Sequence, residues 1–227
     1  MKSISIVIPT YNHYELIHNR LFEIYQRCQP VTEVVVMDNG STDEDHANGM
    51  EWWKTNGMLN VRHFRAEENI GFIRISNIGI KEAIGDIVLL LSNDVQIGTD
   101  LVAPMQKHLG LGQRNLVGGR MIDWNSGWNT FGPQVFPYLE GWLLAATRQG
   151  WKELGYLDED LAPYDFEDVA LSTRAMMLEY NLIPLNNDKF NHLGGQTIGF
   201  NPEREEITNR NREIFRRKYV EQGTVAS

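Results

Sequence analysis

Polar and acidic side chains that could bind a metal ion or a phosphate follow three short apolar runs of this sequence. The segments that contain them are Pro9, Thr10, Tyr11 and Asn12 after the first run, Asp38, Asn39, Gly40, Ser41, Thr42 and Asp43 after the second, and Ser92, Asn93 and Asp94 after the third. Hard divalent cations take oxygen ligands and are often held by one or two carboxylates together with substrate phosphates. A carboxylate buried at the end of an apolar strand is costly without such a partner. Asp94, which closely follows the apolar run 87–91, is therefore a candidate metal ligand.

The segment 38–43 leaves two interpretations open. Its Asn-Gly and Ser-Thr-Asp sequences are common in turns and helix caps, so the segment could simply end a strand and begin a helix. The same side chains could equally bind a ligand, because open parallel sheets bind ligands at the carboxyl ends of their strands.

A second acidic group, Asp165, Glu167 and Asp168, lies at the start of a predicted helix. The helix dipole stabilises negative charge there, which by itself favours a structural role. A carboxylate held at a rigid helix start could instead remove a proton from an attacking hydroxyl. Only the combination with the other polar segments favours this chemical role.

Histidine and tryptophan residues supply further candidates. His192 lies in a loop-like stretch, where a lone histidine is more often a hydrogen-bonded loop residue than a ligand. Trp124, Trp128 and Trp142 could stack on sugar rings, although aromatic residues near predicted strands more often belong to a core. Trp142 ranks first among them because it follows Glu140 and Gly141, in a stretch predicted to form a wall against an acceptor molecule.

The elements that must position these residues alternate between strands and helices. Apolar or β-branched runs predict strands, and apolar residues at helical spacing predict helices. The predicted strands are 4–8, 34–37, 61–64, 87–91, 116–122, 139–147 and 183–185. The predicted helices are 14–26, a polar segment around Trp52 and Trp53, 73–84, a short helix through 101–105 capped by Thr99 or Asp100, 151–155, 167–180 and 203–218. Strands that are apolar on both faces imply an α/β fold with a mostly parallel, Rossmann-like sheet covered by helices.

The composition describes one globular domain of ordinary size. The 227 residues are enough to bury a core without disulfides or structural metals. Hydrophobic residues make up 42% of the chain and charged residues 22%, which favours neither disorder nor a membrane span. The formal net charge of −9 argues against a nucleic-acid binder, which needs a cationic face. We therefore expect a single domain over 1–227.

Three further features bear on location. Cys28 is the only cysteine, so no disulfide can form within the chain, and a cytoplasmic address fits better than a secreted one. The N-terminal apolar run is too short and too soon broken by Pro9 for a signal peptide. The basic C-terminal helix could touch an anionic membrane surface, although a solvated helix face is the favoured interpretation. No transmembrane segment is expected, and the oligomeric state stays open.

Taken in order, these motifs resemble the family 2 glycosyltransferases of GT-A type, over about 4–199. The segments that carry the resemblance are 8–12 for the opening motif, 36–43 for the second motif, 68–72 and 76–79 for the Asn-x-Gly segment, 89–94 for the Asp-x-Asp position, 155–159 and 164–171 with Arg174 for the catalytic-base block, and 191–196 for the late histidine. Each motif is degenerate, but five of them in order make a specific signal.

The resemblance implies a role for each matched residue. The residues implied to bind a nucleotide sugar are Pro9, Thr10, Tyr11, Asn12, Asp38, Asn69, Gly71, Arg74, Asn77 and Asn93, with Asp38 at the base. Asp94 and His192 are implied to bind a divalent metal, Mn²⁺ or Mg²⁺. Asp168 is implied to be the general base with Glu167 as its catalytic neighbour, and Trp142 and Glu167 are implied to contact the acceptor.

The implied activity is inverting, metal-assisted transfer of a sugar from a nucleotide-diphosphate sugar to a hydroxyl of a saccharide or glycan acceptor. A uridine or deoxythymidine diphosphate donor is favoured. Residues 1–98 would form the nucleotide-sugar half, 99–200 the acceptor-binding and catalytic half, and 201–227 a C-terminal helix. The protein would be cytoplasmic, with the membrane surface as a further location.

Other functions stay open at this point. Ser92 and Ala170 stand where the family often has aspartates, which suggests a non-catalytic nucleotide-sugar or carbohydrate-binding module. A nucleotidyltransferase would share the sheet and the metal, but the segment 9–12 lacks a glycine-rich, basic phosphate cradle. A dehydrogenase is disfavoured because no Gly-x-Gly-x-x-Gly follows the first strand.

Overall fold

The structure, a computed structural model, describes residues 1–42, 44–186, 188–194, 199 and 202–221. Asp43, the last residue of the turn or ligand segment predicted above, lies outside the described residues. So do Gly195 and Gln196, which end the segment that resembles the late-histidine motif.

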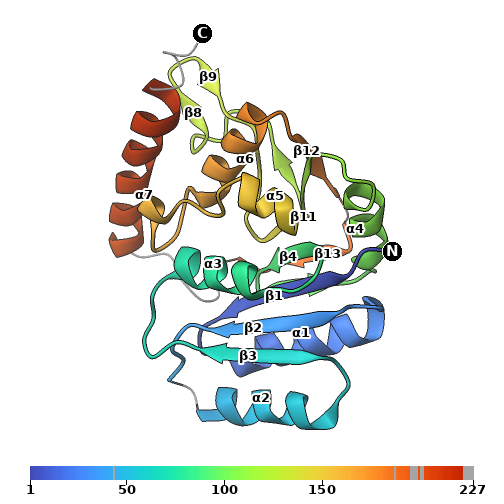
Figure 1. The fold of residues 1–227 in the computed structure, drawn as a ribbon. Coiled ribbons are helices and arrows are strands. Elements are labelled where there is room, and N and C mark those ends of the chain that lie inside the picture. Colours follow the sequence, from blue (N-terminus) through green and yellow to red (C-terminus); the bar gives the residue numbers. More distant parts are fainter. Residues whose placement is uncertain (43, 187, 195–198, 200–201, 222–227) are drawn as a thin grey trace.

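The first half of the chain alternates strands and helices as predicted. Its elements are β1 (Ile4–Thr10), α1 (Tyr14–Arg27), β2 (Glu33–Asp38), α2 (Glu44–Asn56), β3 (Val61–Arg65), α3 (Phe72–Glu82) and β4 (Ile87–Leu91). β1 pairs in parallel with β2 and β4, and β2 pairs in parallel with β3 (Figure 1). Every residue of β4 is buried, so this strand is stable only when helices cover both faces of the sheet.

The second half of the chain adds further strands to the same sheet. Its elements are β5 (Val95–Ile97), α4 (Val102–Leu109), β6 (Asn115–Gly118), β7 (Met121–Ile122), β8 (Thr130–Phe131), β9 (Gln134–Val135), β10 (Tyr138–Leu139), β11 (Leu143–Thr147), α5 (Arg148–Glu153), the 3₁₀ turn η1 (Glu159–Leu161), α6 (Glu167–Met177), β12 (Asn181–Pro184), β13 (Phe190–His192), α7 (Pro202–Phe215) and the π-helical turn η2 (Arg216–Glu221). β11 lies antiparallel between β4 and β6. The sheet order is β12-β6-β11-β4-β1-β2-β3, which confirms the α/β class with a mostly parallel sheet.

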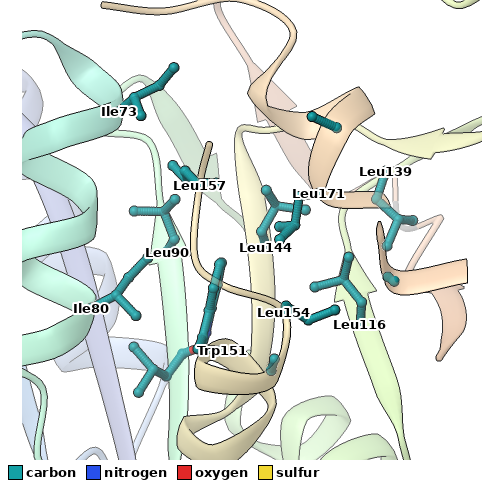
Figure 2. Packing of buried hydrophobic residues seen from close by; sticks show 14 of the residues in the cluster. Ile73, Ile80, Leu90, Leu116, Leu139, Leu144, Trp151, Leu154, Leu157 and Leu171 are labelled. Atoms are coloured by element: carbon teal, nitrogen blue, oxygen red, sulfur yellow. The ribbon is translucent and has the colours of Figure 1, made fainter. Parts of the chain in front are cut away.

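Alternating side chains of the strands feed two cores, one on each face of the sheet. Ile6 of β1 points into a core shared with α1, α2 and α4. Val7, the next residue, points into a core shared with α3, α5 and α6. Figure 2 shows Trp151 of the second core beside Leu90 and Leu154, and the Trp151 indole N–H donates to the carbonyl of Val88 at 2.9 Å. The strands are therefore fixed from both sides, and their carboxyl ends form a rigid edge.

Two predicted strands are each broken in the structure. The run 116–122 divides into β6 and β7, and the run 139–147 divides into β10 and β11. The breaks meet where the Trp142 ring packs on the backbone of Gly119, because a Cβ on Gly119 would lie 1.9 Å from that ring. The prediction of continuous strands was wrong there, since tertiary packing moves this part of the chain out of the sheet.

The helix after β5 is capped as one of the two predicted alternatives. Val102 N–H and Ala103 N–H donate to the Asp100 carboxylate at 2.7 and 3.1 Å. Asp100 rather than Thr99 is therefore the cap. Among the residues that the structure describes, no helix is long and apolar enough to span a bilayer.

Candidate active site

One cavity of about 910 Å³ lies at the carboxyl ends of β1 and β4. The first residues of α3 and α6 and one side of α7 complete its walls. Most of the side chains singled out in the sequence line it. They are Pro9, Thr10, Tyr11, Asn69, Gly71, Arg74, Asn93, Asp94, Trp142, Glu167, Asp168 and His192. This position agrees with the rule that open parallel sheets bind ligands at the carboxyl ends of their strands.

The two metal-ligand candidates meet in this cavity. Asp94 lies in the turn after β4, and His192 ends β13, whose antiparallel pairing with β5 sets His192 opposite Val95. His192 Nε2 lies 3.3 Å from Asp94 Oδ1. The sequence placed His192 in a loop, so its position on a paired strand is a correction. The strand pairing holds the imidazole beside the carboxylate.

Ser92 stands at the first position of the degenerate Asp-x-Asp motif and supports the aspartate at its last position. The Ser92 hydroxyl donates to Asp94 Oδ1 at 2.7 Å. Burial raises the pKa of Asp94, but hydrogen bonds from His192 and Ser92 outweigh it, so the net pKa is lowered. Asp94 is therefore charged at neutral pH.

The donor set fits one divalent cation. Metal bonds of roughly 2.0–2.2 Å to nitrogen and oxygen place two neighbouring ligands about 3 Å apart. The 3.3 Å between His192 Nε2 and Asp94 Oδ1 is close to that separation. One carboxylate and one imidazole leave further coordination positions for phosphate oxygens.

Trp142 lines the cavity with part of its surface already covered. Its ring stacks on His192, with ring centroids 5.8 Å apart and an interplanar angle of 24°. Its Nε1 donates to Glu140 Oε2 at 3.0 Å, and Glu140 accepts two hydrogen bonds of 2.6 Å from Arg120. The structure thus shows Trp142 supporting the imidazole of His192, and an acceptor contact would use the rest of the ring.

Hydrogen bonds join the loops after β2 and β3 at the other side of the cavity. The Asn39 amide donates to Asn69 Oδ1 at 2.8 Å, and Asn39 Oδ1 accepts from the N–H of Ile70 at 2.9 Å. Gly40, with φ of 78°, permits the close approach, because a Cβ there would lie 2.5 Å from the carbonyl carbon of Glu68. Asn39 therefore lines the cavity, although within the segment 38–43 the resemblance assigned a nucleotide-sugar role to Asp38 alone.

Gly71 likewise permits a close approach of two backbone segments, at the start of α3. Its φ is 88°, and a Cβ there would lie 2.5 Å from Cβ of Pro163. The N–H of Ile73 donates to the carbonyl of Pro163 at 3.1 Å. A glycine is therefore required for α3 to approach the segment that precedes α6.

Asn12 and Asn77, expected to contact a nucleotide sugar, do not line the cavity. Asn77 is 2% exposed, and its amide donates to the carbonyl of Leu157 and accepts from the Leu157 N–H, both at 2.9 Å. Asn12 Oδ1 accepts from the Thr42 N–H at 2.8 Å. Both amides bind backbone groups in this structure, and their expected contact with a nucleotide sugar stays a prediction.

Asp38, expected at the nucleotide base, also lies outside the cavity lining. It is fully buried, and its Oδ1 accepts from the Ser41 N–H at 2.8 Å. Its Oδ2 faces His46, His63 and Arg65 instead. Of the two interpretations of 38–43, the structure shows the turn, with Asp38 holding it closed.

The two acids at the start of α6 are held against a glycine. Asp168 Oδ2 accepts from the Gly141 N–H at 3.0 Å, and its Oδ1 accepts from the Val169 N–H at 2.8 Å. A Cβ on Gly141 would lie 3.0 Å from Glu167 Oε1. Gly141 therefore gives both carboxylates room beside the cavity.

Burial raises the pKa of both acids. It is the main cause for Glu167, and the neighbouring charge of Asp168 adds to it, so the pKa of Glu167 lies well above its ordinary value. Burial raises the pKa of Asp168 to about 6, while the N–H groups of Val169 and Gly141 limit the rise. A carboxylate whose pKa is raised toward neutral pH is suited to act as a general base.

The turn before α6 is held in an unusual conformation. Asp165 and Phe166 have φ of 70° and 72°, a region that side chains other than glycine seldom adopt. Two residues of α7 hold Asp165 there. Arg204 binds its carboxylate through two hydrogen bonds of 2.8 and 3.1 Å, and the Thr208 hydroxyl donates to it at 2.7 Å.

Asn211, one turn further along α7, completes this clamp. It is fully buried, and its amide donates to the carbonyls of Leu161, Tyr164 and Asp165 at 2.6, 2.7 and 2.9 Å. This role of Asn211 in holding the turn was not predicted from the sequence. Polar residues at helical spacing, 204, 208 and 211, were the available signal, but a solvated helix face gives the same pattern.

Trp124 and Trp128, the lower-ranked aromatic candidates, do not line the cavity. They are 53% and 56% exposed, so the alternative that placed them in a core is wrong. Trp128 meets Phe166 edge-on, with ring centroids 6.5 Å apart.

The sheet, the cavity at its carboxyl edge and the acids around it define a domain of GT-A type. Residues 5–170 match the family described as Glycosyl transferase family 2. The chain belongs to this family, which confirms the resemblance found in its motifs.

Named proteins agree with this assignment. The "uncharacterized glycosyltransferase YfnE" of Bacillus subtilis (strain 168) is 34% identical over 106 residues, which are 46% of this chain and 26% of that protein. A mannosyltransferase of Pyrobaculum calidifontis, PcManGT, solved with GDP-Man and Mn²⁺, superposes with a TM-score of 0.64 at 21% identity over 81% of this chain. GalNAc-T7, solved with UDP, GalNAc and Mn²⁺, superposes with a TM-score of 0.71 at 18% identity over 97% of this chain.

The chain is short beside these relatives. It spans about a quarter of YfnE, 26%, and about half of the two solved chains, 54% and 49%. The likeness to the two structures is a likeness of fold.

Proposed function

We propose that this chain is an inverting glycosyltransferase, which moves a sugar from a nucleotide-diphosphate sugar to a hydroxyl of a saccharide or glycan acceptor. One observation carries the proposal. A charged carboxylate beside an imidazole, Asp94 and His192, and an acid pair with raised pKa values, Asp168 and Glu167, line the same cavity. The first pair suits a metal-bound diphosphate, and the second suits removal of a proton.

The donor side is built largely by residues of 1–98. Asn69, Gly71 and Arg74 line it together with Thr10 and Asn93. Asn93 donates to the Thr10 hydroxyl at 3.2 Å, which fixes both side chains at the ends of β4 and β1. Arg74 is exposed at this wall and offers a positive charge to a phosphate.

Asp94 and His192 would hold the divalent metal, Mn²⁺ or Mg²⁺. When bound, such an ion neutralises the negative charge that develops on a leaving diphosphate. The likeness to PcManGT and GalNAc-T7, both solved with Mn²⁺, supports the proposal. A uridine or deoxythymidine diphosphate is our proposed donor, and the GDP-Man bound to PcManGT makes guanosine diphosphate the comparison to include.

In the proposed reaction, Asp168 takes the proton of the acceptor hydroxyl as its oxygen attacks the anomeric carbon. The bond from that carbon to the diphosphate oxygen breaks on the opposite side, so the configuration inverts and the nucleoside diphosphate leaves. Glu167 would form a hydrogen bond with an acceptor hydroxyl. Trp142 and Glu167 would contact the acceptor within the half of the chain over 99–200.

The ion pairs of the basic C-terminal segment favour a solvated helix face over contact with a membrane surface. Arg204 pairs with Asp165 at 2.8 Å, and Lys218 pairs with Asp158 at 2.8 Å. These cations are already engaged within the chain.

The test is a panel of sugar nucleotides with and without Mn²⁺ or Mg²⁺. A ligand that binds only the folded protein raises the melting temperature. We expect metal-dependent stabilisation by one nucleotide class, followed by release of its diphosphate when a saccharide acceptor is added. The anomeric configuration of the product, read by NMR, tests inversion. If no nucleotide stabilises the protein, the transferase proposal fails and a carbohydrate-binding role takes its place.

A further inference from the structure

A second cluster of metal-ligating side chains lies behind the loop after β2, outside the cavity. It consists of Asp38 at the end of β2, His46 in the first turn of α2 and His63 in β3. His46 Nδ1 lies 3.6 Å from Asp38 Oδ2, and His63 Nε2 lies 3.9 Å from the same oxygen. One ligand atom from each residue falls within 4.8 Å of the other two.

Two atoms of this cluster are buried without a hydrogen bond. Within the described part of the chain, Asp38 Oδ2 and His63 Nε2 have no hydrogen-bond partner. The Asp38 side chain is fully buried and that of His63 is 10% exposed. Buried polar atoms are nearly always satisfied in folded proteins, so such a pair calls for a ligand.

Arg65 does not supply that ligand. Its Nε lies 3.3 Å from Asp38 Oδ2 and offsets part of the aspartate charge, but its side chain is 46% exposed and sits on the solvent side. The His63 Nε2 atom, 3.9 Å from the same carboxylate oxygen, has no hydrogen-bond partner among the described residues, Arg65 included.

We propose that Asp38, His46 and His63 form a Zn²⁺ site. Zinc takes imidazole nitrogen and carboxylate oxygen at roughly 2.0–2.2 Å, which places tetrahedral ligands about 3.3 Å apart. The separations of 3.6 and 3.9 Å from Asp38 Oδ2, and the ligand atoms of all three residues, which lie within 4.8 Å of one another, would shorten toward that value on binding. The fourth coordination position of the zinc ion would face Arg65. A water molecule would occupy it once the exposed Arg65 side chain turns outward.

The ion would hold α2 against β2 and against the edge strand β3. It would also hold the loop that starts at Asp38, and Asn39, the next residue, lines the cavity. This site differs in kind from the pair Asp94 and His192, which comes from the turn after β4 and from β13 and leaves several coordination positions open. The proposal is independent of the proposed transferase activity.

The experiment titrates the metal-free protein with Zn²⁺ and with Co²⁺, whose visible absorption is strong only in tetrahedral sites. His192→Gln removes the cavity histidine, so the titration is made on wild type, on His192→Gln and on His192→Gln with His63→Gln. His108→Gln, a change on α4 far from both clusters, is the matched control.

We expect wild type, His108→Gln and His192→Gln to bind one tetrahedral Co²⁺ that Zn²⁺ displaces, with a rise in melting temperature. Adding His63→Gln should weaken this binding at least about tenfold, since one of three protein ligands is lost. If the His63→Gln protein does not fold, the His192→Gln protein decides alone. No tetrahedral Co²⁺ spectrum in His192→Gln, or an unchanged one after His63→Gln, overturns the proposal.

Discussion

His192 Nε2 lies 3.3 Å from Asp94 Oδ1, although the two residues are far apart in the sequence. The antiparallel pairing of β13 with β5 makes this contact, and Trp142 covers the far face of the imidazole. The pair fits a cation that has one carboxylate and one imidazole from the protein and takes its other ligands from a diphosphate.

Replacing either member of this pair should abolish metal-dependent donor binding. We expect Asp94→Asn and His192→Gln to weaken Mn²⁺-dependent binding of the nucleotide by more than about tenfold, since losing even an outer-shell partner costs 10–100-fold in metal affinity. The measurement is the Mn²⁺ dependence of the melting temperature with nucleotide present. Asn191→Ala, an exposed neighbour on β13, is the control. Equal Mn²⁺ dependence in all four proteins would place the metal elsewhere.

Asp168→Asn should remove turnover and spare donor binding. General-base catalysis typically contributes about 10²–10⁴-fold, so kcat should fall by that factor. The donor affinity should stay within about twofold, because Asp168 contacts the acceptor in this mechanism. Asp123→Asn, at an exposed carboxylate, serves as the control. Full turnover in Asp168→Asn would assign the base to another residue.

The pH profile should report the same residue. Burial raises the pKa of Asp168 to about 6, and only its ionised form can accept the acceptor proton. Activity should therefore be constant above about pH 7 and fall about tenfold per pH unit below pH 6. The measurement is kcat/KM against pH with a control that the protein stays folded. A profile that is flat down to about pH 5 would contradict an Asp168 base with this raised pKa.

Asn211→Ala should loosen the turn that carries the catalytic acids. The change leaves three buried carbonyls, in Leu161, Tyr164 and Asp165, without their donor. We expect the free energy of unfolding to fall by about 2–4 kcal/mol, measured by urea denaturation. Asn209→Ala, exposed on the same helix, should change it by less than about 0.5 kcal/mol. Similar losses in both variants would show that helix propensity, and not the clamp, is being measured.

The alternation of strands and helices, and a mostly parallel sheet covered by helices, could be predicted from local patterns. The run 87–91 is apolar on both faces and became the buried β4, and Asp94 could be singled out because a charge follows that run. The acids 165, 167 and 168 were found in the same way, from their place at a helix start. In each case the signal lies within a few residues, where backbone periodicity and the helix dipole act.

Some residues drawn from the motifs lie away from the cavity. Asp38 and Asn77 occupy motif positions, but the structure turns both side chains toward the protein interior. Hydrogen-bond partners far along the chain, such as Leu157 for Asn77, decide that orientation. A motif gives the residue type and the spacing, and it does not say which way a side chain points.

The sequence by itself determined the α/β alternation, the apolar strands and the polar segments that follow them. Those properties depend on neighbours within a turn or a strand, so periodicity and residue type are enough. Only the tertiary structure decided that β13 carries His192 to Asp94, that α7 clamps the turn at Asp165, and that Asp38 joins two histidines. These contacts close long loops between elements, and their formation depends on the packing of the whole sheet rather than on any local pattern.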